Sequence, residues 1–204
     1  MKVLLINGSP HEKGCTYTAL SLIAGELKAQ GIETEILHVG GQPVGGCIGC
    51  GGCRSGNGCV FGGVVNEAIE KAKTADAFVF GSPVHYASAA GNMASFMDRL
   101  AYAGGKYLAY KPAAVCCSAR RAGTTSTLDQ LVKYPQFFHM PLVNGSYWAM
   151  VHGSNPEQVL QDAEGCAVMQ ELGRNMAWLL RCIEAGKAAG IDHPQNPPRP
   201  MTNF

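Results

Sequence analysis

The chain alternates between short, strongly apolar runs and longer segments in which apolar residues recur every three or four positions. Continuous apolar runs are typical of strands that are buried on both faces, and the longer spacing is typical of helices packed on one side. The expected strands cover residues 2–7, 32–39, 75–83 and 112–119, and a fifth is expected within residues 141–153. The expected helices cover residues 16–31, 64–73, 92–104, 125–135 and 156–189, the last with a break near Gly165.

This alternation predicts an α/β fold, a doubly wound five-stranded parallel sheet of order 2-1-3-4-5 with helices on both faces. In such a sheet the ligand binds beyond the carboxyl ends of the first and third strands, where the winding reverses. The sequence places a Gly-Ser-Pro at each of these two ends, at residues 8–10 and 81–83. We expect a single domain over residues 1–189, followed by a proline-rich C-terminal tail over residues 190–204.

Composition narrows the class of protein. The 16 Lys and Arg residues balance the 15 Asp and Glu residues, which argues against nucleic acid or a membrane surface as a partner. No signal peptide or transmembrane run is apparent, so we expect a cytoplasmic protein. The nine cysteines should then be reduced thiols. Four of them have apolar neighbours in sequence and are expected in the core: Cys116, Cys117, Cys166 and Cys182.

The loop NGSPHEKGCT, residues 7–16, has the composition of an anion site. It is neither a dinucleotide fingerprint nor a Walker A loop, and it lacks the residues of a triphosphate site, so a monophosphate fits better. Its glycines allow close approach of the backbone, and the following helix offers free N–H groups. Its hydroxyls come from Ser9, Thr16 and Thr18. The alternative is an ordinary strand-to-helix turn with a capping threonine.

Two stretches, KVLLINGSPHEKGCT (2–16) and FVFGSPVHYASAAGNMASFMDRL (78–100), resemble the NAD(P)H-dependent FMN reductases of the flavodoxin-like superfamily. The similarity covers most of residues 1–125. It implies a flavodoxin-like FMN-binding domain in which the first loop holds the FMN phosphate, residues 82–88 lie against the isoalloxazine ring, and residues 118–125 close its other side. The residues that it marks are Ser9, His11, Cys15, Thr16 and Tyr17 for phosphate and ribityl, Ser82, Pro83, Val84, His85 and Tyr86 for the ring, and Ser118, Arg120, Gly123 and Thr124 for the far edge.

Several of these positions have a simpler structural explanation. His85 and Tyr86 could pack on the following helix, and Arg120 with Arg121 could be a solvated pair. The resemblance also implies a homodimer or homotetramer with the site at a subunit interface, where Trp148 could reach the neighbouring subunit's flavin.

The stretch GGCIGCGGCRSGNGC, residues 45–59, contains four closely spaced cysteines within a cysteine-rich loop at 45–61. Zinc sites usually use two separated pairs of cysteines, whereas this compact run is closer to ferredoxin-like cluster ligation. The glycines allow left-handed turns and leave N–H groups free to bond sulfur. The candidate metal ligands are Cys47, Cys50, Cys53 and Cys59.

The same spacing resembles the iron–sulfur flavoproteins, a branch of this superfamily with the pattern C-x₂-C-x₂-C-x₄₋₇-C and a [4Fe–4S] cluster. The chain departs from the branch after the last cysteine, where residues 61–63 are Phe-Gly-Gly instead of an acidic pair. Three alternatives stay open for the loop: an iron–sulfur cluster, a cluster-free thiol loop, and a zinc site.

The expected function is an FMN-dependent NAD(P)H oxidoreductase. Electrons would pass from the nicotinamide cofactor through FMN, with or without a [4Fe–4S] cluster, to a quinone, an azo or nitro compound, or a protein acceptor. No acid–base side chain is required, and either backbone donors or Arg120 near the ring's polar edge would stabilise the reduced, anionic flavin. The alternatives are a non-enzymatic FMN and iron–sulfur electron carrier reduced by ferredoxin, and a zinc-stabilised interaction module.

Overall fold

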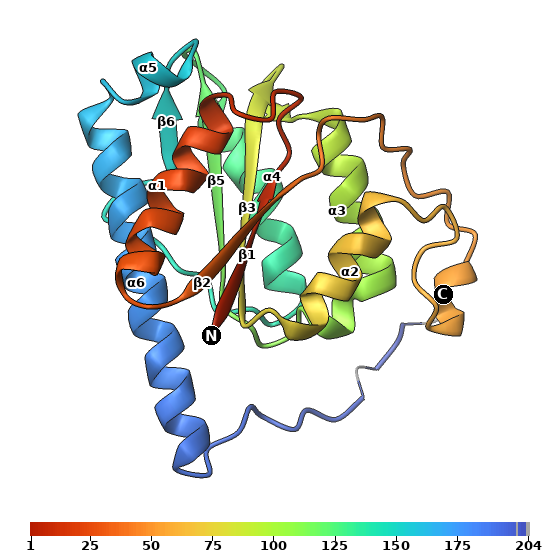
Figure 1. Ribbon diagram of the computed structural model, residues 1–204. Helices are drawn as coiled ribbons and strands as arrows, with labels where there is room; N and C mark the ends of the chain where they lie inside the picture. The colour runs from red at the N-terminus through yellow and green to blue at the C-terminus, as the bar shows by residue number, and fades with distance from the viewer. Residues whose placement is uncertain (199, 203–204) are drawn as a thin grey trace.

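The computed structural model describes residues 1–198 and 200–202. At its centre is a parallel sheet of order β2-β1-β3-β5-β6, shown in Figure 1. The predicted doubly wound arrangement of five parallel strands is confirmed. The strands are β1 (Lys2–Asn7), β2 (Glu33–His38), β3 (Ala77–His85), β5 (Ala113–Ala119) and β6 (Met150–His152).

The strand register brings the carboxyl ends of the three central strands to one edge of the sheet. Asn7 at the end of β1 pairs with Gly81 of β3, and Pro83 of β3 pairs with Ser118 of β5. The Gly8 amide then donates to the Gly81 carbonyl at 2.9 Å. The loops that follow β1, β3 and β5 therefore begin close together at the top of Figure 1.

Helices cover both faces of the sheet, and each face has its own core. The first face is packed by α1 (Cys15–Ala29), the short α5 (Pro156–Val159) and α6 (Ala163–Ala188), and the second by α2 (Val64–Thr74), α3 (Gly91–Gly104) and α4 (Thr124–Phe137), as Figure 1 shows. Side chains alternate along a strand, so Leu5 enters the first core and Leu4 the second. Burial on both faces explains why these strands are continuous apolar runs.

Beyond residue 83, the expected end of the third strand, β3 continues to His85 and turns back into a short antiparallel strand, β4 (Ser88–Ala89). The two turn residues, Tyr86 and Ala87, have φ of 51° and 59°. Two left-handed residues at the tip are the mark of a type I′ turn, for which Asn and Gly are the usual residues. The sequence did not predict this hairpin because Tyr-Ala carries neither signal.

In the C-terminal third, the fifth strand is present and the break in the long helix is displaced. Residues 141–153 contain the expected fifth strand as β6, Met150–His152, and Leu142 makes an isolated bridge to Ala113. Residues 144–146, Asn-Gly-Ser, are turn formers and interrupt the run. The long helix breaks between Val159 and Ala163 instead of near Gly165, because the Asp162 carboxylate caps α6 by accepting from the Gly165 amide at 3.0 Å.

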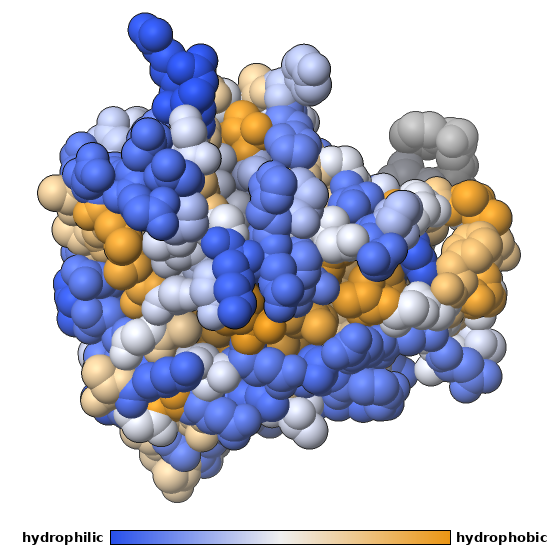
Figure 2. Space-filling model, turned by 45° about the horizontal axis from the view of Figure 1, so that its top comes forward, coloured by the Kyte–Doolittle hydropathy of each residue, from blue (hydrophilic) through white to orange (hydrophobic). Residues whose placement is uncertain are grey.

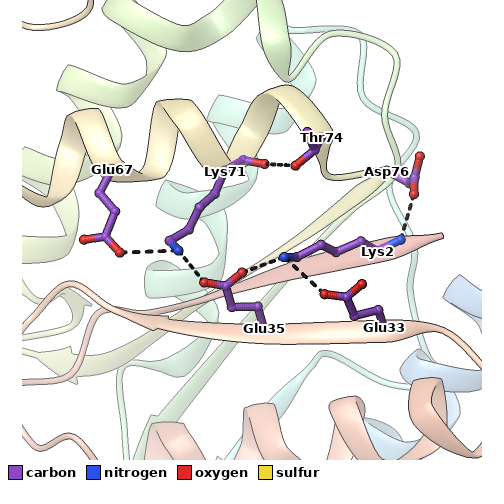
Figure 3. Close-up of polar contacts among 7 residues, drawn as sticks. All are labelled: Lys2, Glu33, Glu35, Glu67, Lys71, Thr74 and Asp76. Atoms are coloured by element: carbon purple, nitrogen blue, oxygen red, sulfur yellow. Dashed lines mark hydrogen bonds and ion pairs between the residues drawn. The ribbon is translucent and has the colours of Figure 1, made fainter.

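A group of ion pairs fixes the edge strand β2, as Figure 3 shows. The Glu35 carboxylate accepts from Lys2 of β1 at 2.8 Å and from Lys71 of α2 at 2.6 Å. Lys2 also pairs with Glu33 at 3.3 Å, and its backbone amide donates to Asp76. Hydrogen bonds from Lys2 and Lys71 hold the pKa of Glu35 below its ordinary value. Glu35 thus joins β1, β2 and α2 away from the carboxyl edge.

The predicted burial of four cysteines is right for two of them. Cys116 and Cys117 are fully buried in β5, and burial raises the pKa of Cys117 to about 12. Cys166 is half-buried, and Cys182 is exposed on α6. The prediction for Cys182 is wrong because apolar neighbours in a helix sequence also occupy its outer side.

The chain beyond α6 has no regular structure among its described residues. His193 stacks on Tyr110 with ring centroids 4.4 Å apart, and the Asn196 amide donates to the Tyr110 hydroxyl. Residues 199, 203 and 204 of the expected tail lie outside the described residues. Within the described part of the chain, no helix combines the length and apolar character needed to cross a membrane.

Candidate functional site

The loop after β1 is held in one shape by its own polar groups. The Asn7 side chain accepts from the Ser9 amide at 3.1 Å and donates to the Glu12 carbonyl at 2.9 Å. The Ser9 hydroxyl accepts from the His11 amide, and His38 at the end of β2 donates to the Ser9 carbonyl at 2.8 Å. The path of the backbone is therefore fixed without a ligand.

The start of α1 leaves backbone donors free for an anion. Gly14 is the N-cap and supplies no side-chain cap, and the first helical bond runs from the Thr18 amide to the Gly14 carbonyl. The amides of Cys15, Thr16 and Tyr17 thus have no partner within the helix, and the first turn carries no acidic residue. Burial, with a smaller contribution from a nearby carboxylate, raises the pKa of the Cys15 thiol, so the neutral thiol adds no negative charge here. These features fit a phosphate group.

A buried hydrogen bond joins this loop to the end of β5. The hydroxyls of Thr16 and Ser118 are 2.8 Å apart, and both side chains are buried. The alternative in which a threonine caps the helix does not apply to Thr16. Its hydroxyl instead ties the first turn of α1 to the strand whose following loop was expected beside the flavin.

The hairpin between β3 and β4 lies against the start of α4. The Ser126 hydroxyl donates to the Ala87 carbonyl at 2.8 Å, and the Gln130 side chain accepts from the Ala89 amide at 2.8 Å. Gly123, with φ of 90°, is the N-cap of α4, and a Cβ there would lie 2.7 Å from the Ala87 Cα. Only glycine satisfies both the left-handed conformation and this approach.

The structure brings the predicted flavin residues to the same edge but gives them different roles. The hydroxyl of Ser82 is used internally, since it accepts from the Ala90 amide at 3.0 Å. His85 and Tyr86 are exposed, so the alternative in which they pack on the following helix is wrong. Arg120 and Arg121 are exposed as well. The remaining predicted residues lie near the carboxyl ends of β1, β3 and β5, either in the connecting loops (Ser9, His11, Gly123), at the ends of β3 and β5 (Pro83, Val84, Ser118), or in the first turns of α1 and α4 (Cys15, Thr16, Tyr17, Thr124).

The cysteine segment connects β2 to α2 and is anchored by two asparagines. Asn92 of α3 donates to the Gly40 and Gln42 carbonyls and accepts from the Val44 amide. Asn66 of α2 pairs with the backbone of Cys59, accepting from its N–H at 2.8 Å and donating to its carbonyl at 3.0 Å. These anchors leave the stretch between residues 45 and 58 to form a protruding loop.

The four cysteines line one cavity of about 330 Å³. A short 3₁₀ helix, η1 (Gly52–Ser55), carries Cys53, and it is bounded by Gly51 and Gly56, both left-handed as predicted for this loop. Among the described residues, no three His, Cys, Asp or Glu side chains lie close enough to hold a single metal ion. Each thiolate of a four-iron cluster binds a different iron, so the ligands of a cluster stand further apart than those of one ion. Four cysteines that line one cavity without converging on a single point therefore fit a cluster better than a single metal ion.

The surface around the cavity is apolar and carries positive charge. Ile48, Val60 and Phe61 line it and are exposed. Figure 2 shows hydrophobic residues gathered at the right-hand edge of the molecule, the side on which η1 lies in Figure 1. Among the described lining residues, the charged ones are Arg54 and Arg99, and none is acidic. The cavity therefore favours a group of net negative charge.

Arg99 and Asn66 are functional candidates that the sequence did not reveal. Arg99 is buried, and its Nε donates to the Cys59 sulfur at 3.2 Å. In the sequence, Arg99 stands out only as a charged residue on the buried side of α3, beside the apolar residues Phe96 and Leu100. That signal does not say which distant segment the cation contacts.

A second hollow, of about 450 Å³, lies between α4 and residues 144–149. Tyr147 and Trp148 line it, with their rings in an edge-to-face arrangement 4.7 Å apart. The loops after β1 and β3 contribute no lining residue among those described. The reach of Trp148 to a neighbouring subunit's flavin stays a prediction.

The fold and the site together define a class. A doubly wound sheet of this strand order is the fold in which flavodoxin binds FMN, beyond the carboxyl ends of β1 and β3. The family model described as NADPH-dependent FMN reductase matches residues 1–155, and the chain belongs to this family. It is thus an FMN-binding oxidoreductase or electron carrier.

Individual relatives agree with this assignment. The chain is 28% identical to an iron-sulfur flavoprotein of Methanocaldococcus jannaschii over 90% of its own length and 100% of the relative's. It is 36% identical to an iron-sulfur flavoprotein of Archaeoglobus fulgidus over 48% of each chain. Among solved structures, RosB with a bound 8-demethyl-8-formylriboflavin-5′-phosphate intermediate matches with a TM-score of 0.70 at 14% identity, covering 100% of this chain and 94% of RosB. That last likeness supports the fold alone.

Proposed function

We propose that the chain is an FMN-dependent NAD(P)H oxidoreductase with a [4Fe–4S] cluster held by Cys47, Cys50, Cys53 and Cys59. Electrons would pass from the nicotinamide cofactor through FMN and the cluster to a quinone, an azo or nitro compound, or a protein. The observation that carries the proposal is the cavity shared by the four cysteines on a chain of the FMN reductase family. Bound FMN would supply the exchange between two-electron and one-electron transfer.

The chain's own residues would bind and orient the flavin at the carboxyl edge of the sheet. The free amides of Cys15, Thr16 and Tyr17 would donate to the phosphate. The rigid loop around Ser9 keeps those amides directed at one point, because its hydrogen bonds are already made. No rearrangement of the loop is then needed for binding.

The hairpin after β3 and the loop after β5 would flank the ring. Pro83 and Val84 would offer an apolar surface, and His85 and Tyr86 are exposed and free to approach the ring or its substrate. Arg120 would supply positive charge at the polar edge of the ring, which stabilises the anionic reduced form. Nicotinamide would stack directly on the flavin, because the chain offers no separate nicotinamide fingerprint.

One observation favours a second candidate, an electron carrier that exchanges electrons with another protein. The exposed apolar side chains of Ile48, Val60 and Phe61 surround the cysteine cavity, as expected of a surface that meets a protein partner. In that case ferredoxin, and not a nicotinamide, would reduce the flavin.

The test is an absorption spectrum of protein purified without oxygen, with iron and acid-labile sulfide assays on the same sample. We expect flavin bands, a broad shoulder near about 400 nm and about four irons per chain. When NADH or NADPH is mixed with the protein, the absorption bands of the flavin should bleach rapidly. Flavin without iron would contradict the cluster, and bleaching by reduced ferredoxin alone would favour the carrier. A colourless protein containing zinc would support the interaction module.

A further inference from the structure

The guanidinium of Arg99 reaches both ends of the cysteine segment. Arg99 belongs to α3 and is only 6% exposed. Its Nη1 donates to the Gly45 carbonyl at 3.4 Å and its Nη2 to the Gly62 carbonyl at 3.0 Å. Its Nε donates to the Cys59 sulfur at 3.2 Å. Each nitrogen of the side chain therefore has a partner on the same segment.

Two of these partners, Gly45 and Gly62, flank the four cysteines along the chain. Gly45 comes before Cys47, and Gly62 comes after Cys59, so one rigid planar group closes the segment at its base. The Phe61 ring lies 5.5 Å from the guanidinium carbon and holds its face by a cation–π contact. The backbone on either side of the cavity is thus fixed to α3, and α3 is fixed to the sheet.

The charge of Arg99 lacks a carboxylate partner. Within the part of the chain that the structure describes, no ion pair involves Arg99, although the side chain is buried. Its neighbour Asp98 accepts instead from the Tyr134 hydroxyl. A buried cation is costly unless an anion or strong acceptors offset it. The acceptors on its three nitrogens are the Cys59 sulfur and the Gly45 and Gly62 carbonyls.

We propose that Arg99 is the positioning residue of the cysteine cavity. It holds residues 45–62 in the shape that receives the cluster, and its N–H bond to the Cys59 sulfur raises the reduction potential of that cluster. The proposal rests on the proposed function, because it takes the cavity to be a cluster site. Hydrogen bonds and positive charge at a ligating sulfur favour the more negative, reduced state.

The first experiment compares Arg99→Gln, Arg99→Lys and Arg54→Gln with the unchanged protein in redox titrations monitored by electron paramagnetic resonance. In Arg99→Gln the equilibrium constant for one-electron reduction should fall about tenfold, a lowering of the potential by about 59 mV. Arg54 also lines the cavity but is exposed, so water screens its charge and Arg54→Gln should shift the potential much less. Equal shifts in Arg99→Gln and Arg54→Gln would overturn the tuning role.

The second experiment tests positioning without a cluster. Hydrogen exchange of residues 45–62 is measured on chelator-treated, iron-free protein, with circular dichroism as the check on folding. Arg99→Gln should exchange at least about tenfold faster than the unchanged protein or Arg54→Gln, because three hydrogen bonds to the segment are gone. If Arg99→Gln does not fold, Arg99→Lys decides, since one ammonium cannot reach all three acceptors.

Failure of the proposed function and failure of the proposed role of Arg99 give different results. If the unchanged protein binds no iron, the proposed function and the tuning role fall, while hydrogen exchange still tests whether Arg99 positions the segment. If iron binds but exchange of residues 45–62 is the same in all variants, the proposed function stands and the positioning role of Arg99 is wrong.

Discussion

The buried hydrogen bond between Thr16 and Ser118 joins the start of α1 to the end of β5. Thr16→Val keeps the shape of the side chain but leaves the Ser118 hydroxyl without its partner. We expect unfolding of the flavin-free protein in urea to require about 2 kcal/mol less free energy. Adding Ser118→Ala should recover part of that loss, because both polar groups are then absent. A double variant as unstable as the sum of the two single variants would contradict this.

Gly123 is the position where backbone conformation and close packing coincide. Gly123→Ala places a methyl group 2.7 Å from the Ala87 Cα at a φ of 90°. We expect a loss of about 2 kcal/mol in stability and weaker FMN binding, measured by thermal unfolding and flavin fluorescence.

Gly25 provides the matched control for this substitution. It lies within α1, it is exposed, and a Cβ there would meet nothing within 4 Å. Gly25→Ala should leave FMN binding unchanged and raise stability by up to about 1 kcal/mol, since alanine favours helix. Equal effects of the two substitutions would show that strain at Gly123 is not the cause.

At the residue scale, local contacts were predictable and distant ones were not. Ser9 and Thr16 could be placed from the end of a strand and the start of a helix. The contact of Arg99 with Cys59 joins residues 40 positions apart, and no periodicity encodes such a pairing. The internal use of the Ser82 hydroxyl depends on a hairpin that was itself unexpected.

Among the elements, the edge strand β2 depends on Glu35 for its attachment to β1 and α2. The pKa of Glu35 is lower in the folded protein than in the unfolded chain, where it is about 4.3. Its contribution to stability is therefore present above that pH and is lost as the pH falls through the folded value. Glu35→Gln should be less stable than the unchanged protein at pH 7, by no more than about 1 kcal/mol, and equally stable once the pH lies below the folded pKa of Glu35.

Thermal unfolding across this pH range measures the difference, and Glu70→Gln is the control. Glu70 pairs with Lys73 on the exposed side of α2 and makes no link to the sheet. Its substitution should leave the pH profile unchanged. If the difference in stability between Glu35→Gln and the unchanged protein persists at low pH, the loss comes from packing of the side chain and not from its charge.

Element boundaries followed the sequence wherever burial set the pattern. The helix expected at 64–73 is Val64–Thr74, and the strand expected at 112–119 is Ala113–Ala119. The sequence failed where local signals competed with packing. Tyr86 and Ala87 adopt left-handed conformations that their own preferences oppose, and contacts from Ser126 and Gln130 of α4 hold the hairpin in place.

For the whole molecule, the flavin site and the cysteine cavity should be separable. The first lies at the carboxyl edge of the sheet, and the second lies beyond α2 and α3. Replacing Cys47, Cys50, Cys53 and Cys59 together by serine should abolish iron binding and keep the FMN dissociation constant within about twofold. Fluorescence titration of flavin-free protein measures the constant. Loss of FMN binding in a folded variant would show that the two sites depend on each other.

The connection from β2 to α2 runs through residues 39–63 and contains the whole cysteine segment. The entropy of closing a flexible loop grows only with the logarithm of its length, by about 0.6 kcal/mol for each doubling. The sheet therefore carries this crossover at little more cost than a shorter one. A redox centre can be gained or lost in this crossover while β1, β3 and β5 keep their register, so a family built on one sheet can differ in how many electrons each member stores.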